Sequence, residues 1–316
     1  MARKTSPSPA QLSLGSKNAA EDLERLGWID NDVLYTLGAA GSPDLTLNTA
    51  YRLAEALGDS YEELRQSLID DKTLRVRLFA LLGGSTALGD HLVAHPEEWK
   101  LLAEPLPDSR EIFHAMLSAV DAVPEDGDPT ATQELDAPGT YRAAEAGNDA
   151  KRALKDAYRT LMMRVAAADL AGTFSSFKGV GGDQEELTYR EVTELLTVIA
   201  DAALTAALAV AMRSVHDDEK ADGKLAVIAM GKCGARELNY ISDVDVIFVA
   251  EPADAKATKV ASEFTAIGNS AFFDVDPNLR PEASPVPWCA PSIPTRRITS
   301  AGRTRGNSKP CSRPAR

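Results

Sequence analysis

The sequence predicts an α+β protein, in which a largely helical N-terminal region precedes a core with a small mixed β-sheet. Two observations support this fold class. Apolar residues recur at helical spacing over residues 19–102 and again over residues 149–171 and 192–210. Two short apolar runs then flank a glycine-containing turn at Gly231, which is typical of neighbouring strands rather than of another helix.

The N-terminal half of the chain is expected to be helical after a short lead. Residues 1–18 contain charge and proline without an apolar pattern and are expected to be disordered. Residues 19–148 are expected to form the helical region, with breaks between helices at residues 41–43 and 58–59, where Gly and Pro or Asp cluster.

The last part of this region is rich in proline and acidic residues. Residues 104–146 include the run Pro-Glu-Asp-Gly-Asp-Pro. They predict a mostly solvated connection with one helix near residues 109–121.

Two histidines in the helical region lie four residues apart. This spacing would place His91 and His95 on one face of a helix as metal ligands. The nearby Glu97 and Glu98 do not complete a zinc-protease motif. The favoured interpretation is that both histidines are exposed or hydrogen-bonded within the protein.

Residues 149–282 are expected to form the core and to begin with two long helices. The first, over residues 149–171, has Asp149 as its expected N-cap. The second starts at a capping box, in which Thr188 accepts from a backbone amide while Glu191 reaches back. The expected buried stripe of this helix comprises Val192, Leu195, Leu196, Ile199, Ala203, Ala206 and Val210.

The strands that follow carry the most informative residues of the chain. One strand is expected from Leu225 to the Gly231 turn, and a second from Asp243 to residue 249. Side chains at positions i and i+2 of a strand point to the same face, so Asp243 and Asp245 should project together. The other face of this strand should carry Val244, Val246 and Phe248.

A third carboxylate follows a helix expected over residues 257–272. Asp276 opens another short strand, and Arg280 lies four residues later. Three carboxylates can hold the divalent ions that clamp the attacking and leaving oxygens in nucleotidyl transfer, and Mg²⁺ prefers such oxygen ligands. Arg280 would neutralise a phosphate. The alternatives left open are a solvated strand end for Asp243 and Asp245, and an acidic turn for Asp276.

The turn between the two main strands is a candidate phosphate site. A glycine turn lets backbone N–H groups approach phosphate closely. The motif differs from a P-loop, which would need Gly at position 226 and Ser or Thr at position 233, where the chain has Ala226 and Cys233. The candidate phosphate- or nucleotide-binding residues are Gly231, Lys232, Ser242 and Arg280.

Together these segments resemble the nucleotidyltransferase superfamily and, within it, the bifunctional glutamine synthetase adenylyltransferase/adenylyl-removing enzymes. The resemblance rests mainly on residues 230–248, which end in Leu-Asn-Tyr-Ile-Ser-Asp-Val-Asp-Val-Ile-Phe, and on residues 275–281. Residues 83–90 and 164–172 also look like this family. The form over residues 237–243 is closer to the N-terminal, adenylyl-removing half of these enzymes.

The resemblance implies both a fold and an activity. Residues 149–282 would be an incomplete nucleotidyltransferase core, in which Asp243, Asp245 and Asp276 match the three metal-binding aspartates. Gly231 and Lys232 match the phosphate-side turn. The intact N-terminal half would remove AMP from an adenylylated tyrosine of glutamine synthetase by phosphorolysis, giving ADP, and the full-length enzyme would also adenylylate it from ATP.

The same resemblance implies the cofactor and the partners. Mg²⁺ is the expected cofactor. The expected partners are glutamine synthetase, ATP or ADP, phosphate and a nitrogen-signalling regulatory protein. Two alternatives remain open: an inactive truncated fragment that only binds a partner, and a nucleotidyltransferase with another protein target.

Composition narrows the setting. The 316 residues are 44% hydrophobic and 26% charged, as in an ordinary soluble protein. No apolar run approaches the roughly 18 residues of a membrane span, and the N-terminus has no apolar signal core, so a cytoplasmic location is expected. The three cysteines suggest no disulfide or metal pattern. The net charge of −13 argues against non-specific nucleic-acid binding.

The C-terminal residues differ from the rest in composition. Residues 283–316 contain seven Lys or Arg and no Asp or Glu, together with six Pro and five Ser. They are expected to be disordered. A frameshift near residue 282 is the favoured explanation, with loss of the second catalytic half, and an arm for an anionic partner is the alternative.

Overall fold

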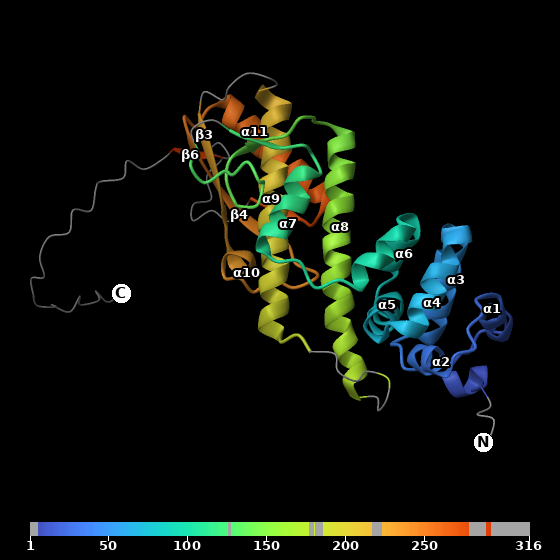
Figure 1. Ribbon diagram of the computed structural model, residues 1–316. Coiled ribbons are helices and arrows are strands. Elements are labelled where there is room, and N and C mark those ends of the chain that lie inside the picture. The colour runs from blue at the N-terminus through green and yellow to red at the C-terminus, as the bar shows by residue number, and fades with distance from the viewer. Residues whose placement is uncertain are drawn as a thin grey trace, which may run out of the picture.

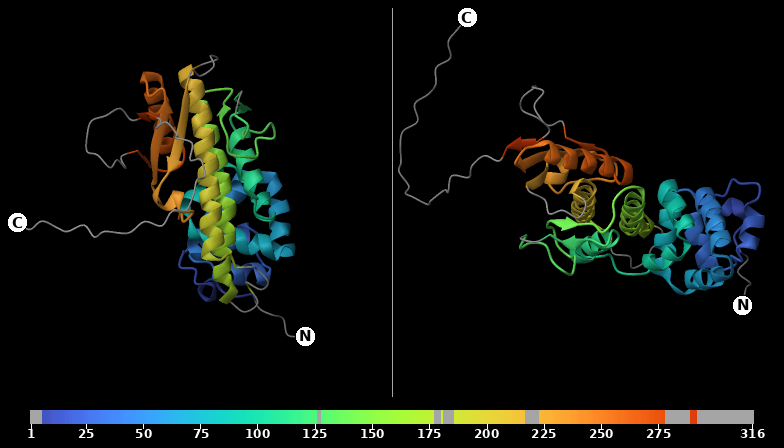
Figure 2. Two further views of the ribbon diagram at one scale, coloured as in Figure 1. Left: turned by 90° about the vertical axis from the view of Figure 1, so that its left-hand side faces the viewer. Right: turned by 90° about the horizontal axis from the view of Figure 1, so that it is seen from above.

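The computed structural model describes residues 6–125, 128–176, 180, 186–216, 223–277 and 289–291. Its elements follow one another across the molecule (Figures 1 and 2). The N-terminal helices lie at one end, two long helices lie in the middle, and the β-sheet lies at the other end. The predicted α+β class, with a helical N-terminal region and a small mixed sheet, is confirmed.

The N-terminal region is built from short helices that pack around one hydrophobic core. The predicted breaks are confirmed, because α2 ends before residues 41–43 and α3 ends at the positive-φ residue Gly58. The elements are η1 (Pro9–Leu12), α1 (Ala19–Arg25), α2 (Asn31–Gly38), α3 (Pro43–Leu57), η2 (Gly58–Ser60), α4 (Tyr61–Asp70), α5 (Lys72–Gly84), α6 (Thr86–Ala94) and η3 (Pro96–Leu102).

The expected disordered lead is ordered from residue 6 onward. Leu12, in η1, is 1% exposed, and Leu14 is also buried in the N-terminal core. Two leucines that fit a core explain why this polar segment docks on the helices. Residues 1–5 lie outside the described part of the chain.

The acidic connection over residues 104–146 contains more structure than expected. It holds the predicted helix, α7 (Ser109–Ser118), and two strands, β1 (Val123–Pro124) and β2 (Tyr141–Arg142), which pair antiparallel. Tyr141 is 2% exposed, and its hydroxyl donates to the carbonyl oxygen of Ala137 at 2.8 Å. The expectation of a mostly solvated connection was therefore wrong for these residues.

Two long helices, α8 (Asn148–Ala171) and α9 (Tyr189–His216), form the centre of the molecule. α8 contributes to both hydrophobic cores: Leu161 packs in the core around the sheet, and Met163 packs in the N-terminal core. The capping box of α9 is confirmed, since Thr188 N–H donates to Glu191 at 2.7 Å. The predicted cap of α8 is wrong, because Gly147 holds the N-cap position.

Among the described residues, α9 alone is long and apolar enough to cross a membrane when judged by length and composition. The expectation that no apolar run approaches the length of a membrane span is therefore wrong for α9. Its apolar window is 78% buried inside the protein. Burial of this kind is also typical of the core helix of a soluble protein, so the apolar composition of α9 is weak evidence for a membrane span.

The sheet is mixed and has four strands. β3 (Lys224–Ala229) pairs antiparallel with β4 (Val244–Glu251), while β5 (Val275–Asp276) and β6 (Cys289–Pro291) pair parallel with β4. The four-residue α10 (Gly231–Gly234) connects β3 to the loop before β4, and α11 (Ala255–Ala271) connects β4 to β5. The ring of Phe248 on β4 packs edge-on against Phe264 of α11, with centroids 5.6 Å apart.

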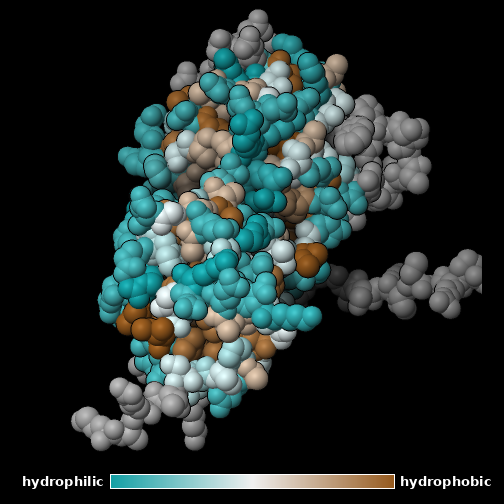
Figure 3. Space-filling view, turned by 90° about the vertical axis from the view of Figure 1, so that its right-hand side faces the viewer, coloured by the Kyte–Doolittle hydropathy of each residue, from teal (hydrophilic) through white to brown (hydrophobic). Residues whose placement is uncertain are grey.

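The basic C-terminal segment is described only at β6. These three residues form a strand, so the expectation of disorder does not hold for them. Residues 278–288, which include Arg280, and residues 292–316 lie outside the described part of the chain. On the opposite side of the molecule, the face of the N-terminal helices is mostly hydrophilic, with small separate hydrophobic areas (Figure 3).

Candidate functional site

Strand β4 begins at Val244, so Asp245 lies on the strand and Asp243 lies directly before it. Burial alternates along this segment: Val244 and Val246 are buried, Asp245 is partly exposed, and Asp243 is exposed. The alternation follows from the two-residue period of a strand. The predicted apolar face of Val244, Val246 and Phe248 is confirmed, whereas the joint projection of Asp243 and Asp245 stays a prediction.

The third aspartate lies beside the second. In the parallel pairing of β4 with β5, Asp245 is the register partner of Asp276, and Val244 is the partner of Val275. Paired residues on neighbouring strands present their side chains to the same face of the sheet. Val275 is held in this register because its N–H donates to Asn269 Oδ1 at 2.7 Å. Two of the predicted carboxylates are therefore cross-strand neighbours.

The glycine turn packs directly against Asp245. Met230 N–H donates to the carbonyl oxygen of Asp245 at 2.8 Å. Gly231 has φ +54°, and a Cβ atom at this position would lie 2.7 Å from Asp245 Oδ2. Gly234 is equally confined, because its Cβ would lie 2.5 Å from the Ala229 carbonyl oxygen. Glycine at both positions is what allows the turn to close over the strand end.

Lys232 and Ser242 meet across the turn. Lys232 Nζ lies 3.3 Å from Ser242 Oγ, and the Ser242 hydroxyl also donates to Asn239 Oδ1. Lys232 is exposed, so its ammonium group can reach an anion at the rim of the sheet. The structure describes six of the seven predicted site residues, and Arg280 is the one outside the described residues. Asp245, Asp276, Gly231, Lys232 and Ser242 lie around the start of β4, and Asp243 directly precedes that strand.

Cys233 sits inside the turn without a chemical role there. Its side chain is buried at 3% exposure, and burial raises the pKa of its thiol to about 12. A thiol that stays protonated is a poor nucleophile and a poor metal ligand. The residue instead fills the core beneath the turn.

Arg236 anchors the turn to α9, a role that the sequence did not reveal. Its guanidinium pairs with Glu194 at 2.6 Å and with Asp201 at 3.4 Å. Its backbone has φ +60°, which is uncommon for a residue other than glycine. Hydrogen bonds from Arg236 lower the pKa of Glu194, whereas burial raises the pKa of Asp201.

Tyr240 ties the loop before β4 to α8. Its hydroxyl donates to Asp169 Oδ2 at 2.9 Å, across 71 residues of sequence. Burial, together with the negative charge of Asp169, raises the pKa of Tyr240, so the phenol keeps its proton and remains a donor. The loop is also held at Leu238, whose N–H lies 3.4 Å from Thr197 Oγ1 of α9.

Comparison with known protein families gives one match that covers most of the chain. Residues 78–292 match the family described as glutamate-ammonia ligase adenylyltransferase. The chain belongs to this family. The matched part includes the whole sheet and every residue of the candidate site, so family membership rests on the same segment as the geometry above.

Curated relatives of this adenylyltransferase family agree with the match. A bifunctional glutamine synthetase adenylyltransferase/adenylyl-removing enzyme of Corynebacterium glutamicum is 50% identical over 292 residues, which cover 87% of this chain. Enzymes of the same name from Nocardia farcinica and Mycolicibacterium smegmatis are 50% and 42% identical, over 89% and 87% of this chain. The chain spans only 26–28% of the length of these relatives.

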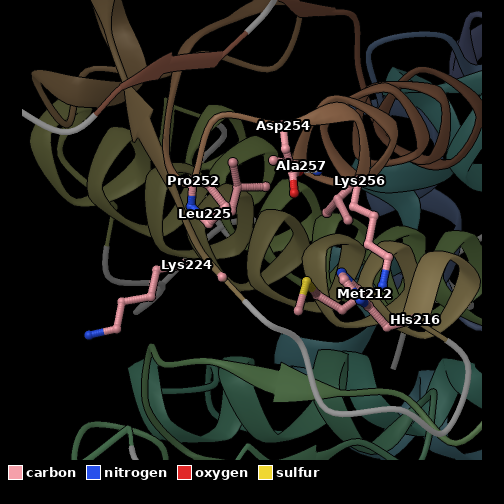
Figure 4. Close-up of a pocket in the computed structure, with 10 residues that line it drawn as sticks. Met212, His216, Lys224, Leu225, Pro252, Asp254, Lys256 and Ala257 are labelled. Carbon is pink, nitrogen blue, oxygen red and sulfur yellow. Dashed lines mark hydrogen bonds between the residues drawn. The ribbon is translucent and has the colours of Figure 1, made fainter.

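Two hollows of this adenylyltransferase-family chain lie away from the aspartates. A cavity of about 40 Å³ at the opposite end of β3 is lined by Met212, His216 and Lys256, among others (Figure 4). This volume holds little more than ordered water and is far below that of a nucleotide pocket. A larger open hollow beside β3 is lined by Asp201 and Arg236 and by none of the three aspartates, all of which the structure describes.

Proposed function

We propose that this chain is the nucleotidyltransferase region of a protein that removes AMP from an adenylylated tyrosine of glutamine synthetase by phosphorolysis. The target and the two activities are those for which the relatives are named. The sequence of residues 237–243, which is closer to the adenylyl-removing half of these enzymes, favours removal of AMP over its attachment. The full-length protein would also carry out the reverse modification, using ATP.

The observation that carries this proposal is the pairing of Asp245 with Asp276 under the glycine turn. Carboxylates this close repel each other unless a cation lies between them. Among the described residues the three carboxylates do not all lie within 4.8 Å of one another, so Asp243 would have to turn toward the paired Asp245 and Asp276 to complete an all-oxygen donor set. Such a set would fit Mg²⁺ or Mn²⁺ and would not suit softer metals. We therefore propose that Asp243, Asp245 and Asp276 hold divalent ions, which would stabilise the charge that develops on the transferred phosphoryl group.

In the proposed reaction, an oxygen of inorganic phosphate attacks the α-phosphorus of the tyrosyl-AMP ester. The bond from phosphorus to the tyrosine oxygen breaks, the tyrosine oxygen takes up a proton, and ADP is released. Gly231 and Lys232 would hold phosphate oxygens through backbone N–H groups and the ammonium charge. Ser242 would position Lys232, with which it is already in contact. Arg280 would be a further phosphate contact.

The proposal extends to the setting of the reaction. Glutamine synthetase, ATP or ADP, and phosphate are the proposed partners, with a nitrogen-signalling regulatory protein as a further one. The proposed location is the cytoplasm.

The proposal is tested in a full-length relative, such as the Corynebacterium glutamicum enzyme. The aspartates matching Asp243 and Asp245 are both changed to Asn, and phosphate-dependent release of ADP from adenylylated glutamine synthetase is measured with and without Mg²⁺. The expected result is a loss of about 10²-fold or more, the usual cost of removing an electrostatic group at a transition state. Undiminished Mg²⁺-dependent release would refute the assignment.

A second candidate function is binding to glutamine synthetase without turnover. The same ADP-release assay on this chain separates the two candidates. Measurable turnover would exclude the binding-only function, whereas binding without turnover would support it.

A further inference from the structure

A second group of metal-ligating side chains lies away from the aspartates, where α6 and η3 meet α8. One ligand atom from each of His91, His95 and Glu98 lies within 4.8 Å of the others. Both α6 and η3 contact α8 at this point, on the side of α8 that faces the N-terminal helices (Figure 1). The proposed reaction does not use these residues.

The ring of His95 is held in the orientation of a metal ligand. Its Nδ1 lies 3.1 Å from the carbonyl oxygen of His91, which can only accept, so Nδ1 carries the proton. The tautomer with this proton alone would present the Nε2 lone pair to a metal ion. Histidines that bind metals are typically fixed in this way, by donating their other ring N–H to a backbone carbonyl.

The free nitrogen of His95 faces another acceptor. Asp156 Oδ2, on α8, lies 3.9 Å from His95 Nε2. With a neutral ring there is no proton between the lone pair and the carboxylate. Such a pair gains stability from a cation placed between its two atoms.

His91 faces a carboxylate in a buried environment. Its Nε2 lies 3.1 Å from Glu98 Oε2, and its side chain is only 1% exposed. Both carboxylate oxygens of Glu98 also lie 3.0 Å from Thr160 Oγ1, which approaches the Asp156 carbonyl as well. A hydroxyl has a single proton, so Thr160 cannot donate to all of these acceptors at once.

We propose that His91, His95, Glu98 and Asp156 bind a divalent transition-metal ion, with Zn²⁺ as the best fit. Two imidazoles and two carboxylates form the nitrogen and oxygen donor set that Zn²⁺ takes in tetrahedral sites. With metal–ligand distances of about 2.0 Å, ligand atoms are separated by roughly 3.3 Å. The His91–Glu98 separation of 3.1 Å is compatible with this value. Asp156 lies 3.9 Å from His95 Nε2 but outside the group whose ligand atoms are all within 4.8 Å of one another, so its side chain would have to turn toward the ion.

The position of the site indicates what the ion would do. Its ligands come from α6, from η3 and from α8, the helix that belongs to both hydrophobic cores. An ion bound here would fasten the N-terminal helices to the helix that also carries Asp169, the partner of Tyr240. Because it binds only the folded chain, it would stabilise the fold by mass action.

The experiment is a titration of the metal-stripped chain with Zn²⁺. Binding is followed by competition with a chromophoric chelator, and unfolding by the thermal midpoint. The expected result is one tightly bound Zn²⁺ per chain with a rise in the midpoint. Co²⁺ in place of Zn²⁺ should give the visible absorption of a tetrahedral site.

Two variants test the ligands without removing the most buried side chain. His95→Gln alters a side chain that is 37% exposed, and Glu98→Gln keeps the shape and the contact with Thr160. Each should weaken Zn²⁺ binding by at least about tenfold and abolish the rise in the midpoint. The control His114→Gln alters an exposed histidine that contacts Glu134 instead, and it should bind Zn²⁺ as the parent chain does.

The variant Asp245→Asn distinguishes Zn²⁺ binding at the aspartates from Zn²⁺ binding at the histidine cluster. It should leave tight Zn²⁺ binding at the histidine cluster unchanged. The proposal is overturned if the parent chain binds less than one equivalent of Zn²⁺ tightly. It is equally overturned if His95→Gln and Glu98→Gln bind Zn²⁺ as the parent does.

Discussion

Asp245 on β4 and Asp276 on β5 are register partners in a parallel strand pair, although 31 positions separate them in the sequence. Gly231 closes over the first of them so tightly that a methyl group there would meet its carboxylate. The candidate site is therefore defined by backbone pairing, which fixes the relative position of two carboxylates before any ligand binds. Such preorganisation is what a metal-assisted transfer requires.

Removal of one of these charges should change stability in opposite directions with and without metal. In metal-free buffer, Asp245→Asn relieves repulsion between like charges on paired strands, which is worth about 0.2–1 kcal/mol. With Mg²⁺ and ADP, the parent chain should gain stability that the variant lacks. Urea unfolding in both buffers checks this. Asp59→Asn, which removes an exposed charge in η2, is the control. If its unfolding free energy changes in the same way in the two buffers, the effect arises from the net charge of the protein and not from the site.

Gly231→Ala should disturb the site as well as the backbone. The change costs about 1–2 kcal/mol for the positive φ and forces Asp245 to move. Gly58 also has φ +54°, but a Cβ there meets nothing within 4 Å, so Gly58→Ala is a control for backbone strain alone. Stabilisation by Mg²⁺ and ADP, measured by thermal unfolding, should be lost in Gly231→Ala and kept in Gly58→Ala. If both variants kept the stabilisation by Mg²⁺ and ADP, the inferred contact between the turn and the site would be contradicted.

Tyr240→Phe removes the hydrogen bond that joins the loop before β4 to α8. The expected cost is about 1 kcal/mol of unfolding free energy, as for a typical hydrogen bond. Tyr189→Phe, at the exposed start of α9, should change stability by less than about 0.5 kcal/mol. Chemical denaturation of both variants is the measurement. If Tyr240→Phe changed the unfolding free energy as little as Tyr189→Phe does, the Tyr240–Asp169 hydrogen bond would not hold the loop.

Glu194→Gln should remove the pH-dependent contribution of the Glu194–Arg236 pair to the unfolding free energy. Because Arg236 lowers the folded-state pKa of Glu194, the pair stabilises the fold above the unfolded pKa. That stability is lost as pH falls through the folded value. The variant should therefore be less stable at neutral pH, by about 0.2–1 kcal/mol for this half-exposed pair, and no less stable well below pH 4.5. Urea unfolding at neutral pH and well below pH 4.5 measures the unfolding free energy of the parent and the variant. A variant that remained less stable than the parent at the acidic pH would contradict the prediction.

Local patterns were enough to predict much of the fold. The capping box at Thr188, the breaks before α3 and after α3, and the alternating faces of β4 all depend on residues close in sequence. The two-residue period predicted Asp243 and Asp245 to be same-face neighbours without any knowledge of the tertiary structure. The resemblance of residues 230–248 to the family added the expected role of this strand.

The rest depends on contacts that no local pattern contains. Tyr141 was assigned to a solvated connection because acidic and proline residues surround it, yet tertiary packing buries it. The bonds from Tyr240 to Asp169 and from Arg236 to Glu194 join segments 71 and 42 residues apart. The same is true of Asp156, which lies 3.9 Å from His95 and comes from another helix. A spacing rule can indicate His91 and His95 but not the carboxylate that faces them.

The most direct test of the central claim is a titration of this chain with Mn²⁺, a spectroscopic substitute for Mg²⁺ that favours the same oxygen ligands. Free Mn²⁺ is measured by electron paramagnetic resonance in the presence of ADP, for the parent chain and for the double variant Asp243→Asn, Asp245→Asn. Glu98→Gln serves as the control for the separate histidine cluster. The account predicts that the parent and Glu98→Gln bind Mn²⁺ alike and that the double variant binds at least about tenfold more weakly. Unchanged Mn²⁺ binding in the double variant would contradict it.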